Sequence, residues 1–133
     1  MNTASSEARL LHMAFLAGAI TDAAALLPML SPRVAGWVWG FRDLPASARF
    51  AMAYGASLMF GWTVLLLWAS RRPVERRFVA LLTTLVIASL ILAEVAAVYS
   101  GVLEARRLVP TWCLQTALLL LFLRAYGNRS VRT

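Results

Sequence analysis

The chain alternates between long apolar stretches and short polar connections. Four of the stretches stay apolar for about twenty residues, the length of α-helix that crosses the hydrocarbon core of a bilayer. They are expected at residues 10–30, 49–69, 78–100 and 108–126. The pattern therefore predicts an all-α integral membrane protein, with a single domain over residues 1–133 built as an up-down-up-down four-helix bundle.

Helix-breaking residues mark the ends of these stretches. Pro28 falls in the last turn of the first stretch, and the pair Ser31-Pro32 ends it. Pro110 suits the first turn of the fourth helix, where its missing N–H costs least. Residues 32–48 contain tryptophans beside arginines, a combination typical of segments in the headgroup region of a membrane. We expect a short helical or strand-like anchor there, with a ligand lid as the alternative.

The link between the second and third stretches is RRPVERR, residues 71–77. So short a link predicts that the two helices run antiparallel, side by side. Two interpretations of its arginines stay open. They are a topology signal, or they bind anionic lipid headgroups, which attract such clusters at roughly 1 kcal/mol per arginine. The arginines concerned are Arg71, Arg72, Arg76 and Arg77.

The distribution of arginine predicts how the bundle is oriented. One side of the expected membrane carries eight arginines: Arg9, Arg71, Arg72, Arg76, Arg77, Arg124, Arg129 and Arg132. The other side carries five: Arg33, Arg42, Arg49, Arg106 and Arg107. Because cytoplasmic loops are enriched in basic residues, both termini are expected in the cytoplasm of a bacterial cell, with the bundle in the inner membrane.

Small residues at four-residue spacing predict where helices approach one another. Such stripes are Ala14 and Gly18; Ala53, Ser57 and Gly61; Ala51 and Gly55; and Ala93, Ala97 and Gly101. They serve either the packing of one bundle or an interface with another copy or another membrane protein. The sequence leaves both interpretations open.

The composition agrees with a lipid-solvated surface. The chain is 61% hydrophobic and 14% charged, with a mean hydropathy of +0.72, which makes a disordered chain or an ordinary soluble enzyme a poor description. Its formal charge of +7 lies beside apolar runs, so we expect lipid contacts rather than nucleic acid. A lone cysteine, Cys113, excludes an intrachain disulfide and a CxxC redox pair. No catalytic or cofactor-binding motif is found.

Two carboxylates lie inside predicted spans, Asp22 in the first and Glu94 in the third. A charge at membrane depth is costly, so such residues usually face the bundle interior and mark ligand or proton sites. Both acids fall in the outer half of the predicted bundle, which favours one cavity open to the periplasm. The alternative is a structural role, with Gln115 as an interhelical hydrogen-bond partner.

Tyr54 and Trp62 are candidates for lining that cavity. His12 lies near the cytoplasmic end of the first span and is expected to be interfacial. A metal site would need more ligands than the sequence places near it, and no metal or cofactor is expected.

The run YGASLMFGWTVLLLWASRRPVERR, residues 54–77, resembles a stretch of small bacterial four-span membrane proteins of unknown function. The resemblance extends through GVLEARRLVPTWCLQ, residues 101–115. The overall plan is also similar to DoxX-like membrane proteins. These resemblances imply four helices in a bacterial inner membrane and supply no activity.

ILAEVAAVYSG, residues 91–101, resembles the segment around the essential membrane glutamate of small multidrug resistance transporters. Those proteins have four short spans and act as dimers, but their glutamate lies in the first span, whereas Glu94 lies in the third. We therefore expect an accessory or small-ligand-binding membrane module. The alternative is a proton-coupled exporter of small cationic compounds acting as a dimer.

Overall fold

The computed structural model describes residues 3–127, which are helical apart from short connections. The helices are α1 (Thr3–Leu30), α2 (Pro32–Trp39), α3 (Ala46–Ser70), α4 (Phe78–Tyr99) and α5 (Ala105–Gly127). Within the described range, α1, α3, α4 and α5 are each long and apolar enough to cross a membrane. The all-α prediction and its four long helices are confirmed, and this architecture suggests a multi-pass membrane protein.

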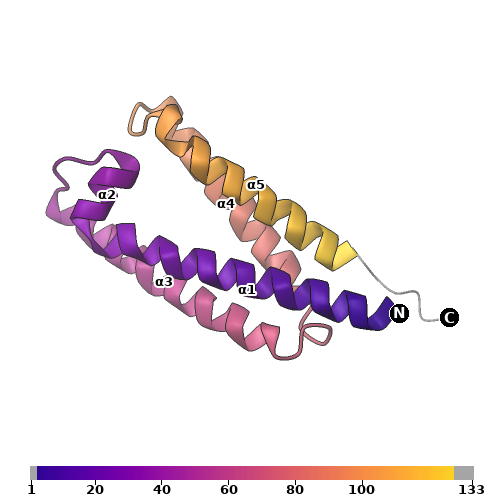
Figure 1. Ribbon diagram of the computed structural model, residues 1–133. Coiled ribbons are helices and arrows are strands. Elements are labelled where there is room, and N and C mark those ends of the chain that lie inside the picture. Colours follow the sequence, from indigo (N-terminus) through magenta and orange to yellow (C-terminus); the bar gives the residue numbers. More distant parts are fainter. Residues whose placement is uncertain (1–2, 128–133) are drawn as a thin grey trace.

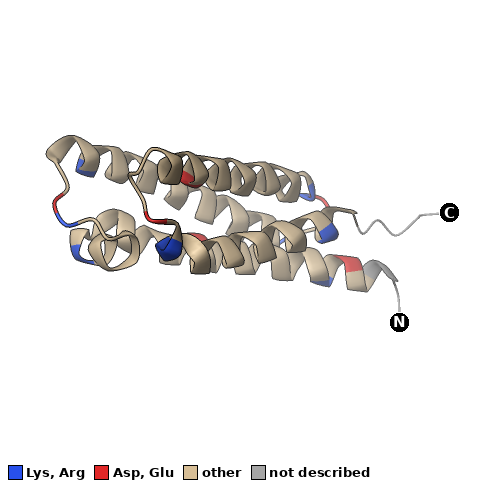
Figure 2. Cartoon of the chain, turned by 90° about the horizontal axis from the view of Figure 1, so that it is seen from above, with Lys and Arg blue, Asp and Glu red and all other residues tan. Residues whose placement is uncertain are grey.

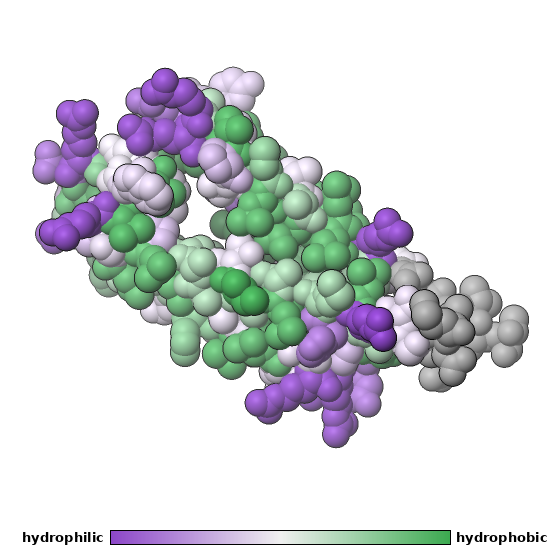
Figure 3. All heavy atoms as spheres, in the orientation of Figure 1, coloured by the Kyte–Doolittle hydropathy of each residue, from purple (hydrophilic) through white to green (hydrophobic). Residues whose placement is uncertain are grey.

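The outward faces of the long helices are as apolar as the faces that pack against neighbouring helices. Ile20, Leu58 and Leu92 are 70%, 66% and 70% exposed. Figure 3 shows apolar side chains over most of the surface between the polar ends. A helix that is apolar all round is a buried or membrane-spanning helix, and soluble monomers rarely expose apolar patches of this extent. The outer surface is therefore suited to lipid.

The long helices form two pairs. α1 packs along α3 and α4 packs along α5, while α1 also contacts α5. The two pairs lie close together near residues 71–77 and diverge toward α2 (Figure 1). The expectation that the helices flanking residues 71–77 lie side by side is wrong. A connection made of successive turns lets the chain reverse, and α1 takes the place beside α3.

The two pairs meet where Gly18 of α1 faces Leu66 of α3 and Phe122 of α5. A β-carbon at Gly18 would lie 2.9 Å from Phe122 Cζ and 3.1 Å from Leu66 Cδ1. We call this meeting of Gly18, Leu66 and Phe122 the central contact. Ala14, one turn from Gly18, is fully buried, so the small-residue stripe of the first span packs inside the bundle as predicted.

The stripe of Ala53, Ser57 and Gly61 is not inside the bundle, whereas Gly55 of the neighbouring stripe packs against α1, since a β-carbon there would lie 2.8 Å from Met29 Cε. Ala53, Ser57 and Gly61 are exposed, and nothing lies within 4 Å of a β-carbon built at Gly61. α3 instead turns the face with Ala56 and Leu66 toward its neighbours, because that face buries a larger apolar side chain. The interpretation of this stripe as internal packing is wrong; a contact with another copy stays a prediction.

In α4, Ala93 and Gly101 are exposed and Ala97 is only partly buried. The buried residues of that helix, including Val79, Thr83 and Ile87, lie nearer its first residue. The end of α4 that carries Gly101 belongs to the half of the molecule in which the helix pairs diverge (Figure 1). This stripe too does not pack inside the bundle, since Ala93 and Gly101 are exposed.

The connection after α1 contains the short helix α2. Ser31 caps it by accepting a hydrogen bond from the Val34 N–H at 3.5 Å, and Pro32 occupies its first position. Gly40 ends it with φ of 80°, a conformation that favours glycine. A β-carbon there would lie 2.8 Å from Arg107 Nε, so α2 rests against the start of α5.

The prediction that Pro110 lies in the first turn of its helix is wrong. α5 begins at Ala105, and the Arg107 N–H bonds to the Glu104 carbonyl at 3.0 Å. The turn formed by the charged residues before Leu108 continues into the apolar helix, which places Pro110 one turn further in. At this position proline removes the hydrogen bond that an N–H would donate to the Arg106 carbonyl.

Candidate functional site

Helical spacing places five polar or indole side chains on the α2 side of the central contact. Asp22 follows Gly18 by one turn of α1, and Trp62 precedes Leu66 by one turn of α3. Gln115 precedes Phe122 by two turns of α5. Each therefore lies on the helix face that makes the central contact. The fourth helix contributes Glu94, which hydrogen-bonds to Gln115, and Trp112 completes the set. We call Asp22, Trp62, Glu94, Trp112 and Gln115 the polar layer.

The members of the polar layer lie at similar depths along the bundle. At 1.5 Å per residue, Asp22 and Trp62 are each about 6 Å from the central contact along their helices, and Gln115 is about 10 Å from it. The helix pairs diverge in this direction, and Figure 3 shows an opening between α2, α1 and the α4–α5 pair. All four long helices thus contribute a polar or indole side chain to the half of the bundle where the pairs separate.

Glu94 and Gln115 join α4 to α5. Gln115 Nε2 donates to Glu94 Oε1 over 3.0 Å. Trp112 lies one turn from Gln115 and also interacts with the Glu94 carboxyl group. Its indole N–H does not complete a hydrogen bond. The predicted partnership of Gln115 with Glu94 is therefore present in the structure.

Several polar atoms of this layer are buried without a hydrogen-bond partner. Among the described residues of the long helices they are Trp62 Nε1, Glu94 Oε2, Trp112 Nε1 and Gln115 Oε1. A buried polar atom left unpaired costs about 1–3 kcal/mol, so native structures contain few of them. Their concentration in one layer offers two donors and two acceptors to a partner that brings the complementary groups.

Asp22 and Tyr54 are placed differently. Asp22 is half-buried on the face of α1 that continues from Gly18. Tyr54 is 65% exposed and stacks on Phe50, with ring centroids 6.5 Å apart, so it does not join the polar layer. Trp62 is partly buried and packs against the apolar core, and its role in lining a cavity stays a prediction.

Two hollows lie away from Asp22 and Glu94. A cavity of about 100 Å³ lies between the end of α1 and the start of α3, lined by Met29, Leu44 and Met52 among others. A shallow groove of about 520 Å³ follows the outer face of α5, and Trp112 is one of its lining residues. Trp112 therefore lies between the Glu94 carboxyl group and the outer surface.

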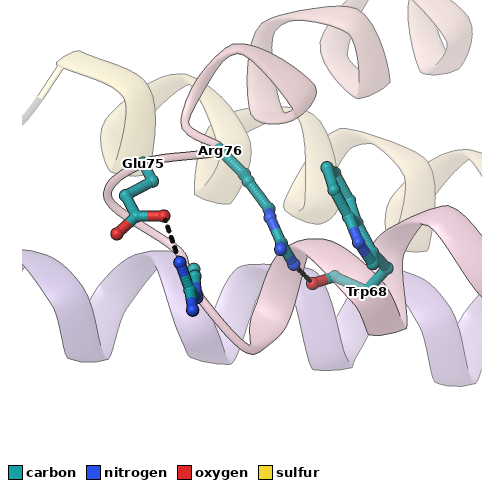
Figure 4. A network of polar contacts seen from close by, with 4 residues as sticks. Trp68, Glu75 and Arg76 are labelled. Atoms are coloured by element: carbon teal, nitrogen blue, oxygen red, sulfur yellow. Dashed lines mark hydrogen bonds and ion pairs between the residues drawn. The ribbon is translucent and has the colours of Figure 1, made fainter.

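The arginines of residues 71–77 are largely occupied by protein groups. Arg76 donates to the Trp68 carbonyl, and its guanidinium lies 3.4 Å from the centroid of the Trp68 ring (Figure 4). Arg72 pairs with Glu75 at 3.3 Å. Arg77 pairs with Glu7 at the start of α1, where both side chains are mostly buried. These contacts fix the connection to α3 and α1, and Arg71 stays exposed.

His12 also belongs to this end of the molecule. Its Nδ1 lies 2.8 Å from the Ser70 carbonyl oxygen, which makes the ring nitrogen a donor. The hydrogen bond attaches α1 to the last residue of α3. Within residues 3–127, no group of three or more His, Cys, Asp or Glu side chains is arranged to hold a metal ion.

The sequence patterns used above did not indicate Trp112 or the central contact. The spacing of Trp112 and Gln115, three residues apart, puts both on one helix face and was an available signal. The role of Gly18 depends on Phe122, more than a hundred residues away, which no local pattern reveals. Comparison with protein-family models, with curated proteins and with solved structures gave no match.

Proposed function

We propose that the chain crosses a bacterial inner membrane four times, up-down-up-down, with both termini in the cytoplasm. The four long apolar helices support the crossings. Basic residues gather at the two ends of the bundle, where headgroups would lie (Figure 2). Among the described residues, the end with residues 71–77 carries six arginines and the α2 end carries five. Arg129 and Arg132, predicted at the same end as residues 71–77, lie outside the described residues. The α2 end then faces the periplasm, and α2 serves as an interfacial anchor.

Within this frame, the protein is an intramembrane module that binds a small ligand in the polar layer and opens toward the periplasm. The observation that carries the proposal is the group of four buried, unpartnered polar atoms contributed by α3, α4 and α5. Lipid supplies no water to satisfy such atoms, so leaving them empty is expensive. A ligand that pairs with them removes that cost.

The side chains indicate the chemistry of the ligand. Asp22 and Glu94 are acidic, and the described parts of the four long helices place no arginine in the polar layer. Trp112 lies beside the Glu94 carboxyl group, Trp62 lies on the face of α3 that makes the central contact, and aromatic faces attract cations. The arrangement fits a small organic cation that carries N–H or O–H donors beside an apolar body.

Ethidium, an aromatic cation with amino groups, is a suitable probe. We expect saturable quenching of tryptophan fluorescence when it is titrated into the purified protein in lipid nanodiscs, because two tryptophans border the site. Asp22→Asn and Glu94→Gln should each weaken binding about tenfold, the equivalent of 1.4 kcal/mol. Glu75→Gln is the matched control, since Glu75 lies outside the spans. Absence of saturable binding, or equal binding by all variants, contradicts the proposal.

A second candidate, a proton-coupled exporter of small cations acting as a dimer, is favoured by the carboxylate of Glu94 inside a span. Measuring the transport of ethidium across the membrane distinguishes the binding module from the exporter. An exporter moves ethidium out of cells or proteoliposomes when a proton gradient is applied, and Glu94→Gln abolishes that movement. A binding module takes up ethidium without net transport.

A further inference from the structure

Glu94 and Gln115 make one hydrogen bond where their chemistry offers two. Gln115 Nε2 donates to Glu94 Oε1 at 3.0 Å, whereas Glu94 Oε2 and Gln115 Oε1 are both buried without a partner. If the carboxyl group is ionised, both unpartnered atoms are acceptors, and neither can satisfy the other. The pair then carries two unsatisfied acceptors and an uncompensated charge.

We propose that Glu94 carries a proton in the resting protein and that Gln115 holds it there, as a carboxylic acid–amide pair with two hydrogen bonds. A proton on Glu94 Oε2 turns that atom into a donor, and Gln115 Oε1 is the free acceptor of the amide that already binds this carboxyl group. A carboxylic acid and a primary amide each present one donor and one acceptor on one edge. A single proton therefore satisfies both unpartnered atoms and removes the charge.

The groups around Glu94 supply no compensating positive charge. α5 presents Gln115 and the indole of Trp112 to the carboxyl group, and α3 carries the neutral indole of Trp62 in the same half of the bundle. From α1 comes Asp22, which is acidic itself. On α4, the next titratable residue, Tyr99, is 89% exposed. None of these groups carries a positive charge, and an uncompensated charge in an apolar environment is costly.

The nearest arginines along α5 are engaged elsewhere. Arg106 and Arg107 lie 3.9 and 3.6 Å from Glu104 Oε2, and Arg107 also rests against Gly40 at the end of α2. Both precede Gln115 by more than two turns. Among the described residues, no cation therefore approaches Glu94 from any helix packed beside it.

The inference rests on the proposed membrane location and adds a form of regulation to the proposed site. A cation that binds beside Glu94 must displace the proton, so binding releases one proton per ligand and weakens as the pH falls. A neutral ligand leaves the proton in place. Gln115 acts as a positioning residue, since it holds the acid in its neutral form.

Infrared spectroscopy of the protein in nanodiscs tests the inference without any ligand. At neutral pH, we expect the carbonyl band of a protonated carboxylic acid, which disappears in Glu94→Gln and persists in Asp22→Asn. In Gln115→Leu the band should move to higher frequency, because the acid loses its hydrogen-bonded partner. Absence of a Glu94 band at neutral pH overturns the proposal, and so does a band unmoved by Gln115→Leu.

Stability supplies a second readout. Glu94→Gln replaces the acid–amide pair by an amide pair that keeps one donor and one acceptor on each side. It should therefore unfold at the same detergent concentration as the natural chain, whereas Glu94→Leu should unfold earlier. Early unfolding of Glu94→Gln would mean that the ionised form holds the helices together, contrary to the proposal. Failure of ethidium binding alone would overturn the proposed function and leave this result intact.

Discussion

Gly18 of α1 lies against the ring of Phe122 so closely that a β-carbon at residue 18 would lie 2.9 Å from Phe122 Cζ. The absence of a side chain at Gly18 lets the α1–α3 pair approach the α4–α5 pair. Phe122 is fully buried at this point and also packs on Phe15, with ring centroids 6.1 Å apart. The angle between the two pairs, and so the width of the polar layer, depends on this contact.

Gly18→Val should therefore destabilise the fold. Extra atoms in a packed contact cost about 1–3 kcal/mol, because Phe122 and Leu66 must move. The measurement is the free energy of unfolding in mixed micelles titrated with dodecyl sulfate. Gly61→Val is the matched control, since nothing lies within 4 Å of its β-carbon, and it should change stability by less than about 0.5 kcal/mol. Equal effects of the two substitutions would contradict the role given to Gly18.

The ion pair of Arg77 with Glu7 should matter more than the exposed pair of Arg72 with Glu75. The Arg77 and Glu7 side chains are 19% and 7% exposed, against 64% and 67% for the other pair. Arg77→Gln leaves a mostly buried carboxylate and should lower the free energy of unfolding by about 3 kcal/mol. Arg72→Gln should lower it by less than about 1 kcal/mol.

A double-mutant cycle over Glu7 and Arg77 measures their coupling. Because each single substitution leaves a buried partner behind, Glu7→Gln with Arg77→Gln should cost clearly less than the sum of the two. Strict additivity would show that the two side chains do not depend on one another.

The contact of Arg76 with Trp68 predicts a smaller effect. Trp68→Leu removes the aromatic face under the guanidinium and should lower stability by about 0.5–1 kcal/mol. Thermal unfolding in detergent, followed by circular dichroism, provides the measurement. Arg71→Gln, at an exposed neighbour, serves as the control and should leave the transition unchanged. If Trp68→Leu leaves the transition temperature unchanged, the cation–π contact does not contribute to stability.

Trp112→Phe separates a binding role from a structural one. The substitution keeps an aromatic ring and deletes an indole N–H that is buried without a partner. Stability should stay equal or rise by up to about 1 kcal/mol, while affinity for ethidium falls. Dodecyl sulfate unfolding and fluorescence titration report the two quantities. A loss of stability with unchanged affinity would assign Trp112 to packing alone.

The sequence was sufficient to predict the four long helices, because continuous apolar runs of this length have few other interpretations. The ends of α3 and α4 lie within a few residues of the predicted spans. The pairing of Gln115 with Glu94 could also be anticipated, since polar side chains inside apolar helices seek one another.

The packing order could not be predicted from the sequence. Residues 71–77 are short enough to keep α3 and α4 together, yet α3 packs on α1, because contacts such as Gly18 with Leu66 join residues far apart in the chain. Alanine occurs on every face of these helices, so the stripe of Ala53, Ser57 and Gly61 did not distinguish a buried face from an exposed one.

The most direct test of the account asks whether the polar layer is reached from the periplasm. In a Cys113→Ser background, Asp22→Cys and Leu58→Cys are treated in intact spheroplasts with a membrane-impermeant maleimide. Leu58 is 66% exposed on the apolar surface of α3 and serves as the lipid-facing control. The account predicts labelling of Asp22→Cys from the periplasmic side and none of Leu58→Cys. Labelling of Asp22→Cys only from the cytoplasmic side, or no better than the control, would contradict it.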